Sequence, residues 1–380
     1  MEKDGWIFLA FLALQLLSSS SQDTSKWLSI DCGNDEISFQ NLLLWDTDSD
    51  YIQVGSNKLV LTKTTRDEFN TLRAFPNNTR NNCYTVPTEK QKIRYIIRVG
   101  FYYGNYDGLS KPPTFNLFIN NILWTTINTS INNGEPFYEE IIYQNKESGF
   151  FKICLVQIKD GGIPFINSIE AMVVFDELYP KMETNATFNL ITRINLGGPE
   201  VRYELWGDEI YNRIWSEKAL PYASFSGYPD SSPTPENHPP ITVLQDTIEF
   251  NASDPMTLTI NLPESTPQSA YIVLYITNLH DDLYNPNKSA QVKIEIDNQD
   301  QGMVDALQFG ETTVVTRYPV NVSGPAINIK LSPADEASFP PMIAAMEVFT
   351  KWGSDKSAAA LKYFSFAYLL IILFLLLLVA

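Results

Sequence analysis

The chain contains an internal duplication, and this feature constrains its fold more than any other part of the sequence. Four short segments recur further along the chain in recognisable form. They are Ile30–Gly33 with Ile194–Gly197, Tyr95–Ile97 with Tyr271–Val273, Asn120-Asn121 with Asp297-Asn298, and Pro164–Glu170 with Pro341–Glu347. Three of these pairs are separated by 176 or 177 residues and the first by 164. A period this long far exceeds that of a solenoid or propeller, so the sequence predicts two homologous modules, each with its own core.

Both ends of the chain are apolar. Residues 1–21 hold a short apolar run that ends in four serines, which is the pattern of a secretory signal peptide. Residues 364–380 are almost wholly apolar and follow a spacer, 351–363, of small and polar residues. This order is typical of a glycosylphosphatidylinositol (GPI) signal, with Asp355 or Ser357 as the attachment residue. A retained transmembrane helix is the alternative, although a spanning helix needs roughly 20 apolar residues.

Charge and residue content exclude several functions. The net charge is −17 and no cluster of lysine and arginine exists, which argues against nucleic acid as a partner. The chain has only two histidines, His238 and His280, and lacks a nucleophile elbow, a zinc-binding His-Glu-x-x-His motif and a Cys–His pair. The segment Asp297–Gly302 has the wrong acid spacing for calcium and is interpreted as a hairpin turn. We therefore predict a protein that is not an enzyme and uses no cofactor or metal.

The cysteines and glycosylation motifs indicate a secreted surface. Three cysteines, Cys32, Cys83 and Cys154, permit one disulfide with one thiol left over, and all three pairings remain open. Six Asn-x-Ser/Thr motifs are candidate N-glycosylation sites. They begin at Asn77, Asn128, Asn185, Asn251, Asn287 and Asn321. Together with the signal-peptide pattern, they predict a glycoprotein of the secretory pathway, located on the extracellular face of the plasma membrane.

The residue pattern is strand-like throughout. Short runs of β-branched and aromatic residues alternate with clusters of Gly, Pro and Asn. This pattern predicts an all-β fold, best fitted by two tandem jelly-roll-like β-sandwiches. The expected divisions are 1–21 for the signal peptide, 26–178 for module 1, 179–192 for a linker, 193–350 for module 2, 351–363 for the spacer and 364–380 for the tail.

One loop has the residue types of a ligand site. The segment from Phe101 to Gly108 places aromatic, amide and carboxylate side chains on a glycine-containing turn. Aromatic faces stack on sugar rings, and amides and carboxylates hydrogen-bond to hydroxyl groups. The candidate ligand-binding residues are Tyr102, Tyr103, Asn105, Tyr106 and Asp107. The alternative is that Phe101 and Tyr103 face the core by strand alternation and that the loop is only a shaped turn.

At several segments the sequence resembles a known family. These segments are Ser29–Gly33, Leu72–Pro76, Asn82–Tyr84, Tyr103–Gly108, Cys154–Val156, Gly162–Ile166, Tyr211–Trp215 and Phe339–Phe349. They are similar, in order, to the malectin-like extracellular domains of plant receptor kinases, especially those that precede leucine-rich repeats. The resemblance covers about 26–350 and implies two β-sandwiches at the cell surface. As ligands it implies cell-wall or cell-surface carbohydrate, or secreted peptides bound across the cleft between the two domains.

The chain differs from that family in lacking leucine-rich repeats and a kinase. We therefore expect a membrane-anchored binding protein that acts as a co-receptor or as a ligand-binding partner of a receptor kinase. The alternative is a truncated, receptor-derived surface glycoprotein with a structural role and no retained ligand site.

Overall fold

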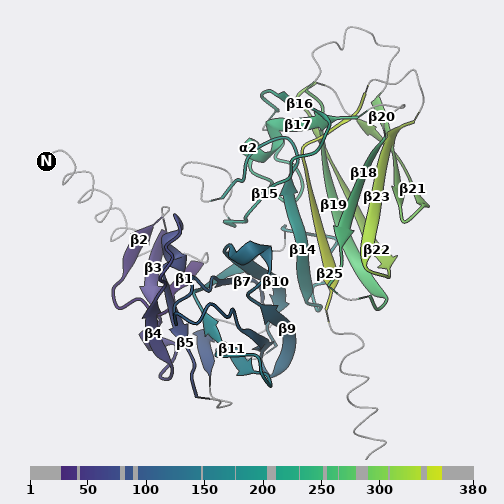
Figure 1. Cartoon of the computed structure of the whole chain (residues 1–380). Coiled ribbons are helices and arrows are strands. Elements are labelled where there is room, and N and C mark those ends of the chain that lie inside the picture. The colour runs from purple at the N-terminus through teal and green to yellow at the C-terminus, as the bar shows by residue number, and fades with distance from the viewer. Residues whose placement is uncertain are drawn as a thin grey trace, which may run out of the picture. The chain divides into compact units, whose positions relative to one another are not determined.

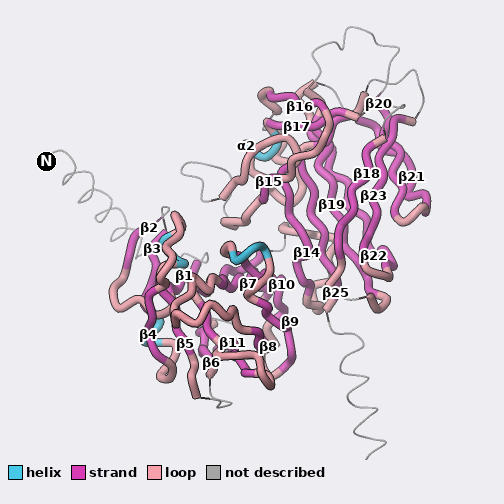
Figure 2. The backbone as a smooth tube through the Cα atoms, in the orientation of Figure 1, coloured by secondary structure: helices cyan, strands magenta, loops and turns pink. Residues whose placement is uncertain are grey.

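The structure, a computed structural model, consists almost entirely of strands and loops (Figure 2). It describes residues 27–40, 43–77, 82–88, 93–146, 149–175, 177–202, 211–230, 232–250, 255–263, 265–279, 290–306, 309–334 and 340–352. Within these ranges the helices are short: α2 (Ile241–Leu244), η1 (Asp48–Asp50), η2 (Asp67–Phe69) and η3 (Asn132–Gly134). The prediction of an all-β protein is confirmed. The predicted signal peptide, the spacer from 353 onward, the tail and both candidate attachment residues lie outside the described residues.

The chain divides into two compact units (Figure 1). Unit 1 consists of Met1–Tyr138 and Glu147–Val174, and unit 2 of Glu139–Lys146 and Phe175–Ala380. A short segment of the first half of the sequence therefore belongs to the second unit. Strand β14 begins at Phe188, inside the range 179–192 that was expected to link the modules.

Unit 1 is built from three sheets. Its strands are β1 (Trp27–Asp31), β2 (Ser38–Gln40), β3 (Leu43–Thr47), β4 (Ser56–Leu59), β5 (Thr71–Ala74), β6 (Cys83–Pro87), β7 (Arg94–Phe101), β8 (Thr114–Ile119), β9 (Ile122–Asn128), β11 (Phe150–Gln157), β12 (Phe165–Ile166) and β13 (Ser168–Val174). Within unit 1, the strands of the first sheet follow the order β2-β3-β1-β13-β7, those of the second β6-β11-β8-β9 and those of the third β12-β5-β4. Strand β3 runs parallel to β1, and the other pairs are antiparallel.

Unit 2 repeats this plan. Its strands are β10 (Phe137–Gln144, within unit 2 from Glu139), β14 (Phe188–Asn195), β15 (Ser216–Glu217), β16 (Ala223–Ser226), β17 (Asp246–Glu249), β18 (Met256–Asn261), β19 (Gln268–Thr277), β20 (Ala290–Ile296), β21 (Gln299–Ala306), β22 (Thr312–Val322), β23 (Ala326–Pro333), β24 (Met342–Ile343) and β25 (Ala345–Lys351). The sheet orders are β10-β14-β25-β19-β22, β18-β23-β20-β21 and β16-β17-β24, with β15 parallel to β14.

The two units therefore have equivalent strands in equivalent sheets. The run β3-β1-β13-β7 in unit 1 corresponds to β15-β14-β25-β19 in unit 2, including the one parallel pair at its edge. The sheet β6-β11-β8-β9 corresponds to β18-β23-β20-β21, and β4-β5-β12 to β16-β17-β24. The duplication seen in the sequence is a duplication of the fold.

Strand register tests the sequence matches residue by residue. Ser29 on β1 lies opposite Glu170 on β13, and Arg193 on β14 lies opposite Glu347 on β25. These pairs are related by the offsets of 164 and 177 found in the sequence. Register therefore supports two of the four sequence matches.

The match between Tyr95–Ile97 and Tyr271–Val273 is displaced by one residue. Met172 lies opposite Ile96, and the equivalent of Met172, Phe349, lies opposite Tyr271. The structural equivalent of Tyr271 is thus Ile96 and not Tyr95. A displacement of one residue exchanges the two faces of a strand, so the sequence matched the right strands in the wrong register.

The duplicated turn pairs have the same conformation in both units. Asn120-Asn121 and Asp297-Asn298 have positive φ at both residues, as a two-residue type I′ hairpin requires. The first side chain of each pair accepts a hydrogen bond from an equivalent neighbouring strand, Lys152 N to Asn120 Oδ1 (2.7 Å) and Asn328 N to Asp297 Oδ1 (2.9 Å). The interpretation of Asp297–Gly302 as a hairpin is confirmed.

Each unit has its own apolar core. In unit 2, inward residues of the two larger sheets and of β17 and β24 form one buried cluster. Its strands alternate buried and exposed positions, as in Met256–Asn261. In unit 1, an aromatic cluster joins the three sheets, with Phe101 of β7 packed at 5.8 Å from Phe115 of β8 and 6.5 Å from Phe165 of β12. Fixing the end of β7 in this way also fixes the start of the candidate ligand loop.

Candidate functional site

The candidate loop follows directly from the buried end of β7 and is held by its first residue. The backbone N–H of Tyr102 donates to Asn167 Oδ1 (2.7 Å), and the Tyr102 hydroxyl donates to the carbonyl of Thr62 (3.0 Å). The backbone N–H groups of Leu61 and Thr62 in turn donate to the carbonyl of Gly104 at 2.9 and 3.0 Å. The loop therefore has a fixed conformation set by the segment that follows β4.

Most polar groups of the loop are used to shape it. The Tyr103 hydroxyl donates to Asp107 Oδ1 and lies 3.2 Å from Asn105 Oδ1. The same two side-chain oxygens accept backbone N–H groups, Leu109 N to Asp107 (3.0 Å) and Ser110 N to Asn105 (2.8 Å). Asn105 has φ of 52°, a left-handed conformation that asparagine tolerates because its amide can hydrogen-bond locally.

The three tyrosine rings of the loop are packed against other side chains and are buried. Tyr102, Tyr103 and Tyr106 are 8%, 7% and 9% exposed. The ring of Tyr106 meets Tyr103 edge-on at 5.7 Å and Phe165 at 5.6 Å. Phe101 and Tyr103 are thus buried, as the shaped-turn alternative expects. Burial, together with the hydrogen bond to Asp107, raises the pKa of Tyr103 to about 12.

Some polar capacity remains at the surface of the loop. Asn105 and Asp107 are both half-buried, and their hydrogen bonds within the described residues involve Oδ1 of each. This leaves Asp107 Oδ2 as an acceptor and Asn105 Nδ2 as a donor. The hydroxyl of Tyr106 is buried and lacks a hydrogen-bond partner in the described part of the chain. The loop can therefore offer a ligand one carboxylate oxygen and one amide N–H, in fixed positions.

The residue that orders this loop is Asn167, which the sequence analysis did not select. It is fully buried, and besides accepting from Tyr102 N its amide donates to the carbonyls of Phe69 (3.2 Å) and Thr71 (2.8 Å). Its equivalent in unit 2 is Ala344. The difference between the two copies was visible in the sequence, and it is the signal that marks Asn167 as special to unit 1.

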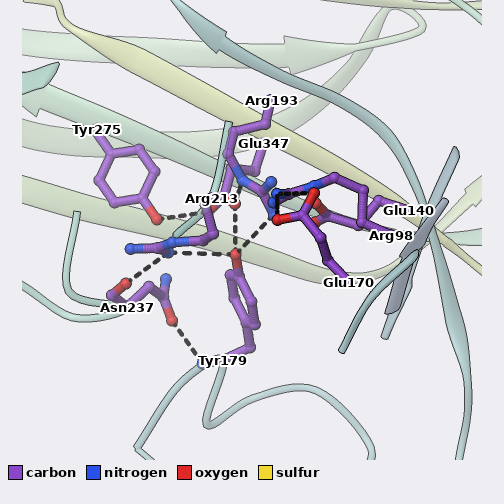
Figure 3. Close-up of polar contacts among 9 residues, drawn as sticks. All are labelled: Arg98, Glu140, Glu170, Tyr179, Arg193, Arg213, Asn237, Tyr275 and Glu347. Atoms are coloured by element: carbon purple, nitrogen blue, oxygen red, sulfur yellow. Dashed lines mark hydrogen bonds and ion pairs between the residues drawn. The ribbon is translucent and has the colours of Figure 1, made fainter. Parts of the chain in front are cut away.

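A second polar cluster lies inside unit 2, around Glu347 (Figure 3). Glu347 accepts from Arg193 Nε (2.6 Å), the Tyr179 hydroxyl (2.5 Å) and the Tyr275 hydroxyl (2.7 Å). Arg193 also pairs with Glu140 at 2.9 Å, and all of these side chains are buried.

A layer of aromatic rings and a second guanidinium complete this cluster. The Arg193 guanidinium lies 5.7 Å from the ring of Trp215, and that of Arg213 lies 5.2 Å from the same ring. Arg213 also donates to the carbonyl of Asn237 at 2.9 Å. Burial, followed by the nearby Glu347 carboxylate, raises the pKa of Tyr179. A cluster that is closed to solvent and paired internally serves structure, so we assign it to the stability of unit 2.

The other predicted site residues have definite places. Cys83 on β6 and Cys154 on β11 lie opposite each other and form a disulfide, while Cys32 is a buried free thiol. Of the asparagines in the glycosylation motifs, four are exposed and two fall outside the described residues. The exposed ones are Asn77, Asn128, Asn185 and Asn321, and the others are Asn251 and Asn287.

The described residues contain neither a metal-binding cluster nor a membrane-spanning helix. No group of three or more histidine, cysteine or acidic side chains there is arranged to hold a metal ion. No helix in the described ranges is both long and apolar enough to cross a membrane.

Comparison with known proteins identifies the family. A profile of the malectin-like domain matches residues 30–351. The chain therefore belongs to the malectin-like domain family, as its sequence motifs indicated. This domain is a non-catalytic binding domain, so the matched region is not an enzyme.

The relatives are receptor kinases from Arabidopsis thaliana. One leucine-rich repeat receptor-like serine/threonine-protein kinase is 29% identical over 367 residues, and a second is 27% identical over 366 residues. These matches cover 90% and 92% of this chain but only 40% of each relative. The chain thus spans about two fifths of the length of the relatives that it matches.

Solved structures share the fold. The extracellular domain of ANXUR2 from Arabidopsis thaliana has a TM-score of 0.71 at 16% identity, covering 87% of this chain and 97% of that domain. A crystal structure of the plant peptide RALF23 in complex with FER and LLG2 contains a chain with a TM-score of 0.69 at 16% identity, covering 87% of this chain and 96% of that one. At these identities the likeness establishes the fold alone.

Proposed function

We propose that the protein is an extracellular binding module that captures a ligand and acts as a co-receptor or ligand-binding partner for a receptor kinase. The observation that carries this proposal is the malectin-like match over residues 30–351, shared with the receptor kinases described above. The ligand classes are a cell-wall or cell-surface carbohydrate and a secreted peptide. One structural neighbour was crystallised with a peptide, which favours the second class for this chain.

The proposed architecture is two tandem jelly-roll-like sandwiches, 26–178 and 193–350, joined by 179–192. The equivalent sheet orders of the two units support this division. The proposed location is the extracellular face of the plasma membrane, reached through the signal peptide and held by a lipid anchor or a tail helix at 364–380. A disulfide and four exposed glycosylation motifs support an oxidising, extracellular compartment.

The geometry of the loop also favours a peptide over a sugar. A sugar ring stacks on an open aromatic face, but the rings of Tyr102, Tyr103 and Tyr106 are each more than nine-tenths buried. A peptide needs only separate donors and acceptors, and Asp107 Oδ2 and Asn105 Nδ2 supply one of each. We therefore place the ligand contact at Asn105 and Asp107, with the tyrosines as the support beneath them.

The test uses residues 22–352, secreted and folded, against a glycan array and a library of secreted peptides. We expect Asp107→Asn to weaken binding of the selected ligand about tenfold, equivalent to about 1.4 kcal/mol. Asp160→Asn is the matched control because Asp160 is an exposed aspartate in another turn of unit 1. Equal binding by both variants would place the ligand elsewhere.

The alternative role is a structural surface glycoprotein without a ligand site. Failure of both libraries to yield any ligand would favour that role over the binding proposal. Release of the full chain from cell membranes by phospholipase would support the lipid anchor, whereas resistance to release would support a retained helix.

A further inference from the structure

The first sheet of unit 1 ends in a short strand that exposes apolar side chains. In the described residues, β2 is the end strand of its sheet and pairs with β3 alone. Phe39 on β2 lies opposite Leu44 on β3, and both side chains are 51% exposed. Ile37, two residues before Phe39 and therefore on the same side of an extended chain, is 63% exposed. The neighbouring Trp45 is fully buried and anchors this hairpin in the core.

This apolar edge lies in the most acidic stretch of unit 1. Residues 27–57 contain six acidic residues and no lysine or arginine. Asp35 and Glu36, directly before the strand, are exposed, and Asp46 on β3 is half-buried. Asp48 forms an ion pair with Arg73 at 2.6 Å. The ion pairs of the described residues include none for Asp35, Glu36 or Asp46. The edge therefore presents negative charge together with apolar surface.

Three other edge strands in the described residues, β9, β21 and β22, carry features that β2 lacks. An open edge strand is a template for another strand, and proteins usually block it with charge, proline or a covering group. Edge strand β9 ends in Asn128, and edge strand β22 contains Pro319 and Asn321, so both carry a glycosylation motif. The edge strand β21 is capped by Arg317, which donates to the carbonyl of Gln301 at 3.0 Å. Residues 35–40 hold no proline and no such motif.

We propose that β2 is the docking edge for an extended, basic peptide segment that adds to the first sheet of unit 1 as a further strand. Backbone N–H and C=O groups of the peptide pair with β2, which supplies affinity without sequence preference. Alternate apolar side chains of the peptide meet Ile37 and Phe39, and its lysines or arginines meet Asp35 and Glu36. The inference rests on the proposed function, because it specifies which class of peptide the protein binds. It gives that peptide a docking surface on β2 that is separate from the Asp107 loop.

The test uses the full chain and a synthetic peptide of alternating lysine and valine as the probe. Its two analogues are the glutamate–valine peptide and a lysine–valine peptide methylated at every backbone nitrogen, which has no N–H to donate along either edge and cannot pair as a strand. We expect the first peptide to bind with a Kd on the order of 10 μM, and each analogue to bind at least about tenfold more weakly.

Substitutions then locate the site. Phe39→Lys places a blocking charge on the edge and should weaken the lysine–valine peptide about tenfold or more. Ile122→Lys on the edge strand β9 is the matched control, because Ile122 is 53% exposed, and it should leave binding unchanged. Glu36→Lys leaves the apolar surface intact and should weaken the lysine peptide while strengthening the glutamate peptide. Circular dichroism establishes that all three variants are folded.

Several results would overturn the proposal. Equal binding of the methylated peptide would exclude strand addition, and binding that survives in both Phe39→Lys and Glu36→Lys would exclude this edge. Concentration-dependent dimers that Phe39→Lys abolishes would identify a second copy of the chain as the occupant. Loss of the peptide in Asp107→Asn but not in Phe39→Lys would overturn the docking edge and leave the proposed function standing.

Discussion

Replacing Asn167 by alanine tests whether one buried amide orders the candidate ligand loop. The change converts this position of unit 1 into the residue that unit 2 has at the equivalent place, Ala344. In the wild-type protein the Asn167 side chain makes three hydrogen bonds, to Tyr102 N (2.7 Å), to the carbonyl of Thr71 (2.8 Å) and to that of Phe69 (3.2 Å). Alanine can make none of them.

The expected cost follows from those contacts. Each hydrogen bond contributes about 1 kcal/mol net, and a buried N–H left without a partner adds about 1–3 kcal/mol. Because Asn167 is fully buried, water cannot replace its amide at Tyr102 N without opening the structure. The free energy of unfolding of unit 1 should therefore fall by about 4–6 kcal/mol, and by less if the loop rearranges.

Two measurements check this expectation. Urea unfolding gives the loss of stability, and amide hydrogen exchange should show faster exchange across residues 102–110 than in unit 2. The control is Asn116→Ala, because Asn116 makes a single exposed hydrogen bond, accepting from Thr126 at 2.8 Å. That variant should lose less than about 1 kcal/mol. A loss at Asn167 no larger than at Asn116, or unchanged exchange in the loop, would refute the assignment.

Three further predictions concern charge, pH and the disulfide. Glu347→Gln should lower the free energy of unfolding by about 3–5 kcal/mol because it breaks the buried ion pair with Arg193. The control Glu183→Gln breaks a more exposed pair and should lower it by less than about 1 kcal/mol. Equal urea midpoints for the two variants would contradict this prediction. Burial raises the pKa of Asp31 from 3.8 to about 6, so between these pH values the folded protein binds more protons than the unfolded chain. The free energy of unfolding of the wild-type protein should therefore fall by on the order of 2–3 kcal/mol as the pH rises through 6. Asp31→Asn should remove this fall, as urea titrations at pH 4.5 and 7.5 would measure, and an unchanged slope would exclude Asp31 as its source. Replacing Cys83 and Cys154 together by serine opens a link between residues 71 apart and should cost about 4 kcal/mol, whereas a thermal midpoint equal to wild type would disprove a structural disulfide.

The internal repeat shows which structural equivalences between the two units the sequence alone could predict. The turn pairs Asn120-Asn121 and Asp297-Asn298 were matched correctly because a type I′ turn needs particular residues at two adjacent positions, a local requirement. The pairing of Glu170 with Glu347 was also correct, because each lies in a repeated segment of seven residues. Tyr95 and Tyr271 were matched one residue out of register. Three apolar residues fit either register, and only the strands on either side decide between them.

The candidate ligand site shows what the sequence alone could not predict. Its five residues were found together because they adjoin in sequence, and the structure places Tyr103, Asn105 and Asp107 in one hydrogen-bonded turn. The sequence could not show that the aromatic rings are packed against Phe165, nor that Asn167, about 60 positions later, holds the loop. Both depend on contacts between segments distant in the chain.

The sequence by itself determined the all-β character, the duplication and the family, because each of these is recorded in local patterns that repeat or match. Tertiary structure alone decided which cysteines pair and that Glu347 is enclosed by two tyrosines and Arg193. It also decided that, among the described strands, β2 is an apolar strand at the end of its sheet. The physical reason is that a buried polar group or a sheet edge is defined by what lies beside it in space. Its partners come from strands far apart in the sequence, and no short segment contains that information.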